Sequence, residues 1–246
     1  MELPPPTLQR TKSALLQSGV WTPELQARIE EFEQLCILQI RSEPIRTVVV
    51  EYLETVAPIE FFTAPASSTG RNHPLWQSAV AGILANTVEC CIGIDRKMRM
   101  YPSLTDSRDN PLPEDRDVIY AATILSDTHK PADFGKPWDE WAHHRTAAEH
   151  WRDLATRRGL PATVVNLVYD AVLWHLGRFT PGSPKSVDPR ESLRLHTFIT
   201  HELDMDFSNR NLSDIFSRKI FKLTPAEELG TTSPGQSGHA SSTDSA

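Results

Sequence analysis

The residues most able to do chemistry in this chain are an aspartate and several histidines that follow or open apolar segments. Asp127 ends an apolar run and is followed by Lys130, while His143 and His175 lie beside tryptophans in two later segments. Carboxylate and imidazole groups are common protein ligands of Zn²⁺, Mn²⁺ and Fe²⁺. A divalent metal site is therefore the chemistry that these residue types can support.

Each of these residues also has a purely structural interpretation. Asp127 at a helix end can accept hydrogen bonds from loop amides. His143 can be a satisfied histidine between packed tryptophans, and His175 near a helix terminus would meet the helix dipole favourably. Residue types alone favour these structural roles over metal binding. Ser126 is not a candidate nucleophile, because the chain has no Gly-x-Ser-x-Gly context, and it has no Gly-rich phosphate loop either.

Length, composition and charge narrow the classes of protein that remain. The chain has 246 residues, of which 39% are hydrophobic, and a formal net charge of −7. This composition can fill a core, and the acidic balance argues against a surface that binds nucleic acid over its whole extent. Three cysteines without CxxC spacing predict reduced thiols. We expect a cytoplasmic protein with no membrane partner, because neither a secretory signal nor an apolar stretch of about 20 residues is present.

Apolar residues recur at spacings of three and four along most of the chain, which predicts an all-α fold. Residues 22–56 should form two helices separated near Pro44. We predict a helical N-terminal extension over 1–60, a helical domain over 61–223 and a disordered, Ser/Thr/Gly/Pro-rich tail over 224–246. Within the domain, helices are expected over 74–100, 114–125, 138–158, 161–176, 189–207 and 211–223.

Several short segments, taken in order, resemble the HD-domain superfamily of metal-dependent phosphohydrolases. The resemblance is closest to the HD domain of bacterial 3′→5′ exoribonucleases and of some conjugative relaxases. It implies a helical bundle in whose middle ligands from different helices meet around one or two divalent metals. The segments are Phe61-Phe-Thr-Ala-Pro-Ala66, Ala79-Val-Ala-Gly-Ile-Leu-Ala-Asn-Thr87, Ala122-Thr-Ile-Leu-Ser-Asp-Thr-His-Lys130 and Trp174-His-Leu-Gly177 with Gly182-Ser-Pro184.

The ligand set of the first metal in that family is degenerate here. Asn86 stands where the family has its first histidine, and Ser126 replaces the histidine of the His-Asp pair. His201 stands at the position of a late aspartate ligand, and Asp204, one turn further on, is a candidate for the lost carboxylate role. Asn86 and His201 therefore enter only as weak or substituted metal ligands.

The ligands that the resemblance implies for the second metal are all present, namely Asp127, His143 and His175. Two imidazoles and one carboxylate can hold a single Zn, Mn or Fe ion with open coordination positions. The resemblance therefore implies a reduced, single-metal site centred on these three residues.

Basic residues next to the motifs are candidates for binding phosphate. The resemblance retains the lysine of the family's His-Asp-x-Gly-Lys as Lys130, with His129 in place of the glycine and able to reach the pocket. Lys130 and Arg178 would bind a phosphate group, and His73, in the loop before an apolar segment, could hydrogen-bond to one. The alternatives are solvated charges and a surface-loop histidine.

Two functions of different class follow. In the first, the protein is a metal-dependent phosphohydrolase that acts on a nucleotide or a nucleic-acid phosphodiester, with Asp127 and Lys130 as catalytic residues. In the second, it is a catalytically inactive HD-like module that binds a nucleotide or a protein partner. The sequence feature that separates the two is the ligand set, which, with its first-metal ligands lost, favours the second.

Overall fold

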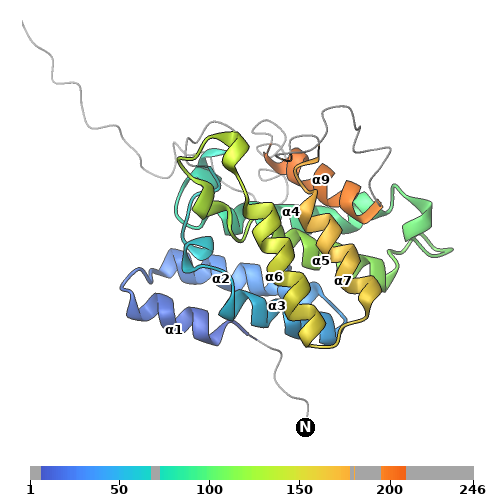
Figure 1. Ribbon diagram of the computed structural model, residues 1–246, viewed down its shortest axis with the longest axis horizontal. Helices are drawn as coiled ribbons and strands as arrows, with labels where there is room; N and C mark the ends of the chain where they lie inside the picture. The colour runs from blue at the N-terminus through green and yellow to red at the C-terminus, as the bar shows by residue number, and fades with distance from the viewer. Residues whose placement is uncertain (1–6, 68–72, 178–179, 181–194, 209–246) are drawn as a thin grey trace, which may run out of the picture.

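The computed structural model of the protein describes residues 7–67, 73–177, 180 and 195–208 (Figure 1). Apart from one isolated β-bridge, every regular element among these residues is helical, which confirms the predicted all-α class. The α-helices are α1 (Gln9–Gln17), α2 (Pro23–Leu35), α3 (Glu43–Thr55), α4 (Gly82–Met98), α5 (Pro113–Ser126), α6 (His143–Arg157), α7 (Ala162–Leu173) and α9 (Leu195–Ser208). Short 3₁₀ helices are η1 (Ile37–Gln39), η2 (Ile59–Phe62), η3 (Leu75–Ser78), η4 (Pro102–Leu104), η5 (Lys130–Asp133) and η6 (Trp138–Glu140).

Local signals explain where the N-terminal helices begin. The Thr22 side chain accepts a hydrogen bond from the amide of Leu25, 3.2 Å away, and a proline occupies the first turn of α2. Pro44 lies in the first turn of α3, so the predicted division of residues 22–56 into two helices is confirmed. The Asp117 carboxylate accepts from the amides of Arg41 and Ser42 just before α3, at 3.0 and 2.6 Å.

Two predicted helices begin later than expected. The 74–100 segment becomes an α-helix only at Gly82, because the 3₁₀ helix η3 and Ala81, with φ at 59°, come before it. The 138–158 segment becomes an α-helix only at His143, after η6. The predicted 211–223 helix, the first residues of the 189–207 helix and the 224–246 tail lie outside the described residues.

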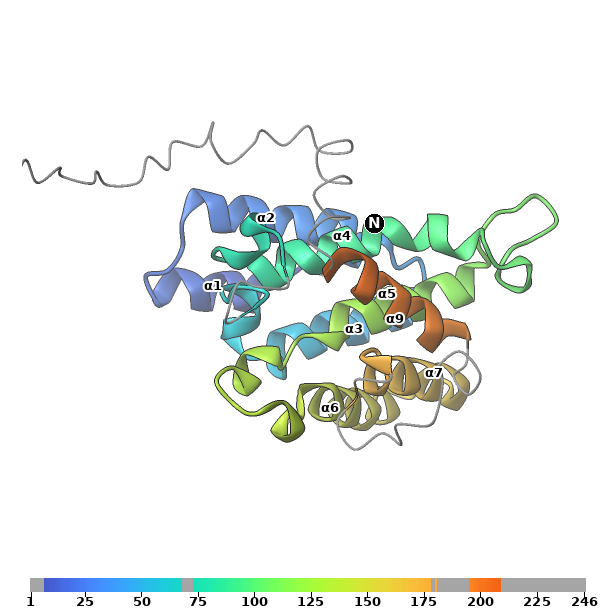
Figure 2. The ribbon, with the colours of Figure 1, turned by 90° about the horizontal axis from the view of Figure 1, so that it is seen from above.

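Helix α5 is the central element of the bundle. It contacts α3, α4, α6, α7 and α9, and every residue from Arg116 to Ser126 is buried. Figure 2 shows α2 and α4 on one side of it and the α6–α7 pair on the other. Because α5 is covered on all sides, the position of its C-terminal end is determined by several neighbours at once.

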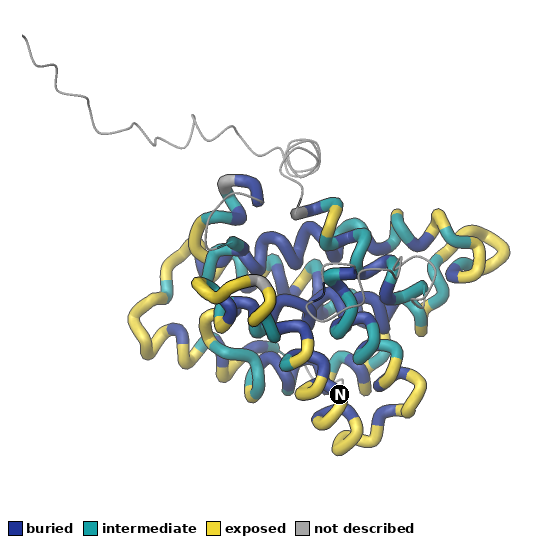
Figure 3. Tube along the Cα trace, turned by 45° about the horizontal axis from the view of Figure 1, so that its top comes forward, coloured by how far each residue is buried: buried dark blue, intermediate teal, exposed yellow. Residues whose placement is uncertain are grey.

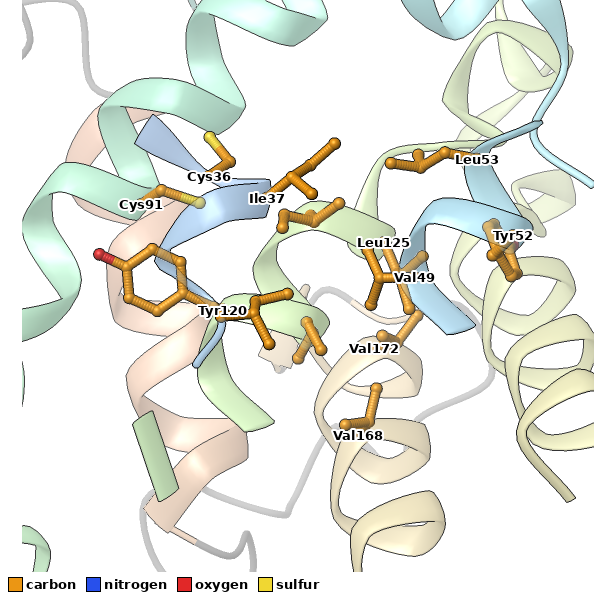
Figure 4. Packing of buried hydrophobic residues seen from close by; sticks show 14 of the residues in the cluster. Cys36, Ile37, Val49, Tyr52, Leu53, Cys91, Tyr120, Leu125, Val168 and Val172 are labelled. Atoms are coloured by element: carbon orange, nitrogen blue, oxygen red, sulfur yellow. The ribbon is translucent and has the colours of Figure 1, made fainter. Parts of the chain in front are cut away.

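A single hydrophobic core extends through the N-terminal helices and the rest of the described chain. The burial view shows buried backbone concentrated in the middle of the bundle and exposed residues at the loops (Figure 3). In Figure 4, Ile37 and Val49 lie in the same packed region as Leu125 and Val172, which come from α5 and α7. None of the described helices combines the length and the apolar character that crossing a membrane requires.

Gly82 allows the backbone before α4 to pack closely. A Cβ atom at this position would lie 1.8 Å from the Gln77 carbonyl oxygen and 2.7 Å from the Ala66 amide nitrogen. The same two residues are joined by a backbone hydrogen bond of 2.7 Å. A glycine is therefore required where η3 and the 64–66 segment meet the start of α4.

Tyr52 joins α3 to the turn that follows α5. Its hydroxyl lies 3.0 Å from His129 Nε2 and 3.4 Å from the Ala147 carbonyl oxygen on α6. Burial, followed by the nearby His150 and His143 rings, lowers the pKa of His129 to about 4. His129 is therefore neutral in the folded protein at neutral pH, and its ring is engaged by Tyr52.

The lowered pKa of His129 makes folding stability depend on pH. Between about pH 6.5 and about pH 4 the unfolded chain binds a proton at His129 that the folded chain does not, so stability is lost as the pH falls through this window. The His129→Gln variant lacks that proton uptake. Its free energy of unfolding in urea should fall less steeply than that of the wild type between about pH 7 and about pH 4.5. Parallel pH curves for the two proteins would contradict this assignment.

Candidate metal centre

Three side chains from different parts of the chain meet at the C-terminal end of α5. Asp127 directly follows α5, His143 is the first residue of α6, and His175 lies just beyond α7. One ligand atom from each lies within 4.8 Å of the other two, and all three residues are buried. The structure thus brings together the trio that the HD resemblance implied.

The facing atoms of these residues have no hydrogen-bond partner in the described part of the chain. Asp127 Oδ1, His143 Nε2 and His175 Nε2 are all buried and unpaired. Each Nε2 lies 3.6 Å from Asp127 Oδ1, which is too long for a hydrogen bond. A cation held tetrahedrally at about 2.0 to 2.2 Å by each atom would place its ligands about 3.3 to 3.6 Å apart. The spacing therefore fits three ligands around one metal.

The outer nitrogens of both imidazoles are held by groups that can only accept hydrogen bonds. His143 Nδ1 donates to Asp133 Oδ2, and His175 Nδ1 donates to the Val172 carbonyl oxygen, each over 2.8 Å. The proton of each neutral ring is therefore on Nδ1, and the lone pair is on the Nε2 that faces Asp127. Metal-binding histidines are oriented in this way by an acceptor that binds the ring N–H on the side away from the metal.

The electrostatics of the trio follow from burial and close charges. Burial opposes ionisation of Asp127, yet Lys130 and the two imidazoles hold its pKa well below the usual value. Burial lowers the pKa of His143, whereas at His175 the Asp127 carboxylate outweighs burial and raises it. A metal ion would therefore replace a proton that His175 otherwise retains more readily than a free histidine.

Asp133 is a supporting residue that the sequence analysis did not identify. Besides His143 Nδ1, Asp133 Oδ2 accepts hydrogen bonds from the backbone amides of Ala142 and His143 at 2.9 and 2.8 Å. One carboxylate thus caps the first turn of α6 and orients its first side chain. Asp133 lies nine and ten residues before these amides, in no recognised capping motif, so no regular spacing signals the contact.

Lys130 is buried rather than solvated. Its ammonium nitrogen donates to Asp127 Oδ2 over 2.8 Å, and the residue is only 8% exposed. The interpretation of Lys130 as a solvated surface charge is therefore wrong. The two oxygens of the Asp127 carboxylate have different neighbours: Oδ2 binds an ammonium group, and Oδ1 faces two imidazoles.

Two of the positions that correspond to the first metal in the resemblance, Asn86 and Ser126, lie beside a small cavity. The residues that line the cavity include Asn86, Ser126, Asp127 and Asp204, and its volume is about 10 Å³. That space is enough for about one water molecule. Asn86 Oδ1 is buried without a partner in the described residues, whereas the Ser126 hydroxyl donates to the Ala122 carbonyl.

His201 supports the site through the backbone. Its Nδ1 donates to the carbonyl oxygen of His175 over 2.6 Å, and its ring packs against Gly177, where a Cβ atom would lie 2.6 Å from the ring. The three-residue ligand group does not include His201, and Asn86 lines the adjacent cavity together with Asp127. His129, bound to Tyr52, does not join the ligand group either. Arg178 lies outside the described residues.

His73 is a buried residue with a defined tautomer, and the expectation of a surface-loop histidine is wrong. Gln77 Nε2 donates to Glu89 Oε2 over 2.8 Å, so the other end of the Gln77 amide, Oε1, must accept a hydrogen bond from His73 Nδ1 at 2.7 Å. Trp76 Nε1 donates to the second oxygen of Glu89. Burial first, and then Lys130, lower the pKa of His73. A neutral His73 therefore offers an Nε2 lone pair, which suits a hydroxyl group or water better than a phosphate.

Comparisons with protein-family models, with curated proteins and with solved structures found no match to this chain. The HD resemblance therefore stays a prediction from short motifs, and the geometry of the site stands by itself.

The contact between Asp133 and His143 predicts an effect on metal affinity. Replacing the group that holds the outer nitrogen of a metal-binding histidine typically weakens metal binding by about 10- to 100-fold, and we expect this loss in Asp133→Ala. Asp133→Asn, which keeps an acceptor oxygen, should lose less. Competition with a chromophoric zinc chelator measures both affinities.

The matched control for this experiment is Asp139→Ala, an exposed aspartate in the same connection between α5 and α6. It should bind zinc as the wild type does. A folded Asp133→Ala protein with wild-type zinc affinity would show that Asp133 does not orient a ligand.

Proposed function

We propose that the protein binds one divalent transition-metal ion through Asp127, His143 and His175 and uses it to hydrolyse a phosphate ester of a nucleotide or nucleic acid. The observation that carries this proposal is the meeting of three buried ligand atoms without partners among the described residues. Leaving such atoms unpaired costs about 1 to 3 kcal/mol each, and more for a charged group. A metal ion would satisfy all three together.

The donor set defines the kind of metal and its use. Two neutral imidazoles and one carboxylate suit Zn, Mn or Fe and leave coordination positions for water and substrate. A metal held in this way lowers the pKa of a bound water and polarises a phosphoryl oxygen. The phosphate-ester substrate class is supported by the motif resemblance to HD phosphohydrolases.

The surrounding side chains have roles that suit this reaction. Lys130 binds Asp127 Oδ2 and so directs Oδ1 toward the imidazoles. Lys130, Asp127 and Asp204 all influence the pKa of His73, so His73 lies within electrostatic reach of the centre. With its Nδ1 proton committed to Gln77, His73 can accept a proton or a hydrogen bond at Nε2.

A catalytically inactive module is the second candidate, and one observation favours it. The three ligand residues are at most 5% exposed, and three buried ligands just after α5, at the start of α6 and just beyond α7 would also serve to hold these helices together. In this case a metal would bind and stabilise the protein without turnover, and a nucleotide or protein partner would bind elsewhere on the same fold.

Metal analysis and turnover together test the proposal. Purified protein incubated with zinc and desalted should carry about one equivalent by elemental analysis, whereas His143→Ala and His175→Ala should retain less than about a tenth of it. The matched control is His150→Ala, an exposed histidine on the same helix, which should bind as the wild type does.

Hydrolysis of bis(p-nitrophenyl) phosphate and of nucleotides should require the metal and disappear in both ligand variants. Stoichiometric metal without turnover on any ester would support the inactive module. Wild-type protein that takes up none of Zn²⁺, Mn²⁺ or Fe²⁺ would refute both the metal centre and the hydrolytic function.

A further inference from the structure

Asp127 is shared between the candidate metal ligands and a cation that belongs to the chain itself. Lys130 Nζ is 2.8 Å from Asp127 Oδ2, and both residues are buried. The other oxygen, Oδ1, faces the two Nε2 atoms at 3.6 Å. The Asp127 carboxylate would therefore lie between two positive charges. One is the Lys130 ammonium group, and the other would be a metal ion held by the two imidazoles.

A second carboxylate contributes to the same charge cluster. Asp204, on α9, lines the small cavity together with Asp127. Lys130 Nζ binds Asp127 Oδ2 directly, at 2.8 Å, and Asp204 also attracts this ammonium group. The lysine and the two acids therefore form one charge cluster.

Besides Cys90, the residues that line the cavity beside these acids all carry side-chain oxygen atoms. Asn86 Oδ1 is buried and unpaired among the described residues, and Thr123 and Thr200 line the same space as Asp127 and Asp204. Carboxylate, amide and hydroxyl oxygens are the preferred ligands of Mg²⁺ and Mn²⁺. Without the lysine, this lining would form an acidic pocket with an unsatisfied amide oxygen.

We propose that the Lys130 ammonium group acts as a tethered cation in place of a second metal ion, so that the centre holds a single metal. The inference rests on the proposed metal site of Asp127, His143 and His175. By occupying Asp127 Oδ2, Lys130 prevents this carboxylate from binding a second metal ion through that oxygen. A phosphate ester bound at the centre would then face two cations: an exchangeable metal ion and the Lys130 ammonium group, which cannot dissociate from the chain.

The test is the number of Mn²⁺ ions bound per chain, measured by electron paramagnetic resonance of the free ion during titration. The wild type should bind one Mn²⁺ tightly, and Lys130→Arg, which keeps the charge, should also bind one. Lys130→Met and Lys130→Gln should bind two, and spin coupling between neighbouring ions should broaden the bound signal. Lys12→Met is the matched control, because Lys12 also pairs with a carboxylate but belongs to α1.

The outcomes separate this inference from the proposed function. Wild-type protein that binds two coupled Mn²⁺ ions, or folded Lys130→Met and Lys130→Gln proteins that still bind one, would overturn the tethered-cation role and leave the metal centre intact. Wild-type protein that binds none would refute the proposed function itself. Both neutral variants are titrated because either can lose stability. A second equivalent of Mn²⁺ should then raise the melting temperature of the variants but not that of the wild type.

Discussion

The structure depends on one buried carboxylate, that of Asp127, and on the positive groups that keep it ionised. An ionised carboxylate inside a protein is strongly disfavoured unless it is paired and hydrogen-bonded. Here Lys130 binds one oxygen at 2.8 Å, while the other is left facing His143 and His175 without a hydrogen bond. This incomplete pairing distinguishes the site from an ordinary buried ion pair.

The helices around Asp127 position its partners with few degrees of freedom. The end of α5 is fixed by packing on five other helices. Asp133 caps α6 and holds His143 by the ring and by the backbone, and the last turn of α7 supplies the Val172 carbonyl that orients His175. His201 of α9 in turn holds the backbone of His175. Each imidazole is thus restrained from behind, as a preorganised ligand must be.

Much of the fold and the central trio could be predicted from the sequence, but for different reasons. Spacings of three and four identified the helices, because the buried stripe of each helix leaves that pattern. Nothing in the periodicity distinguished His143 or His175 from structural histidines. Those residues were found only through the order of the short motifs, and no wider comparison with known proteins adds to that signal.

The supporting contacts could not be predicted, because they have no fixed offset along the chain. Asp133 accepts a hydrogen bond from the first amide of α6. Glu89 accepts one from Gln77, 12 residues earlier in the chain, and Gln77 in turn accepts one from His73, four residues before it. Both depend on how the connections fold rather than on helical spacing. The burial of Lys130 was missed for the same reason, since a lysine in a motif and a lysine in solvent look alike in one sequence.

The central claim, that Asp127, His143 and His175 form one metal centre, is tested most directly by X-ray absorption spectroscopy of the zinc-loaded protein. Two imidazole nitrogens and additional oxygen ligands, all at about 2.0 to 2.2 Å, are the first shell that this geometry predicts. A shell with sulfur at about 2.3 Å, or one made of oxygen alone, would contradict it.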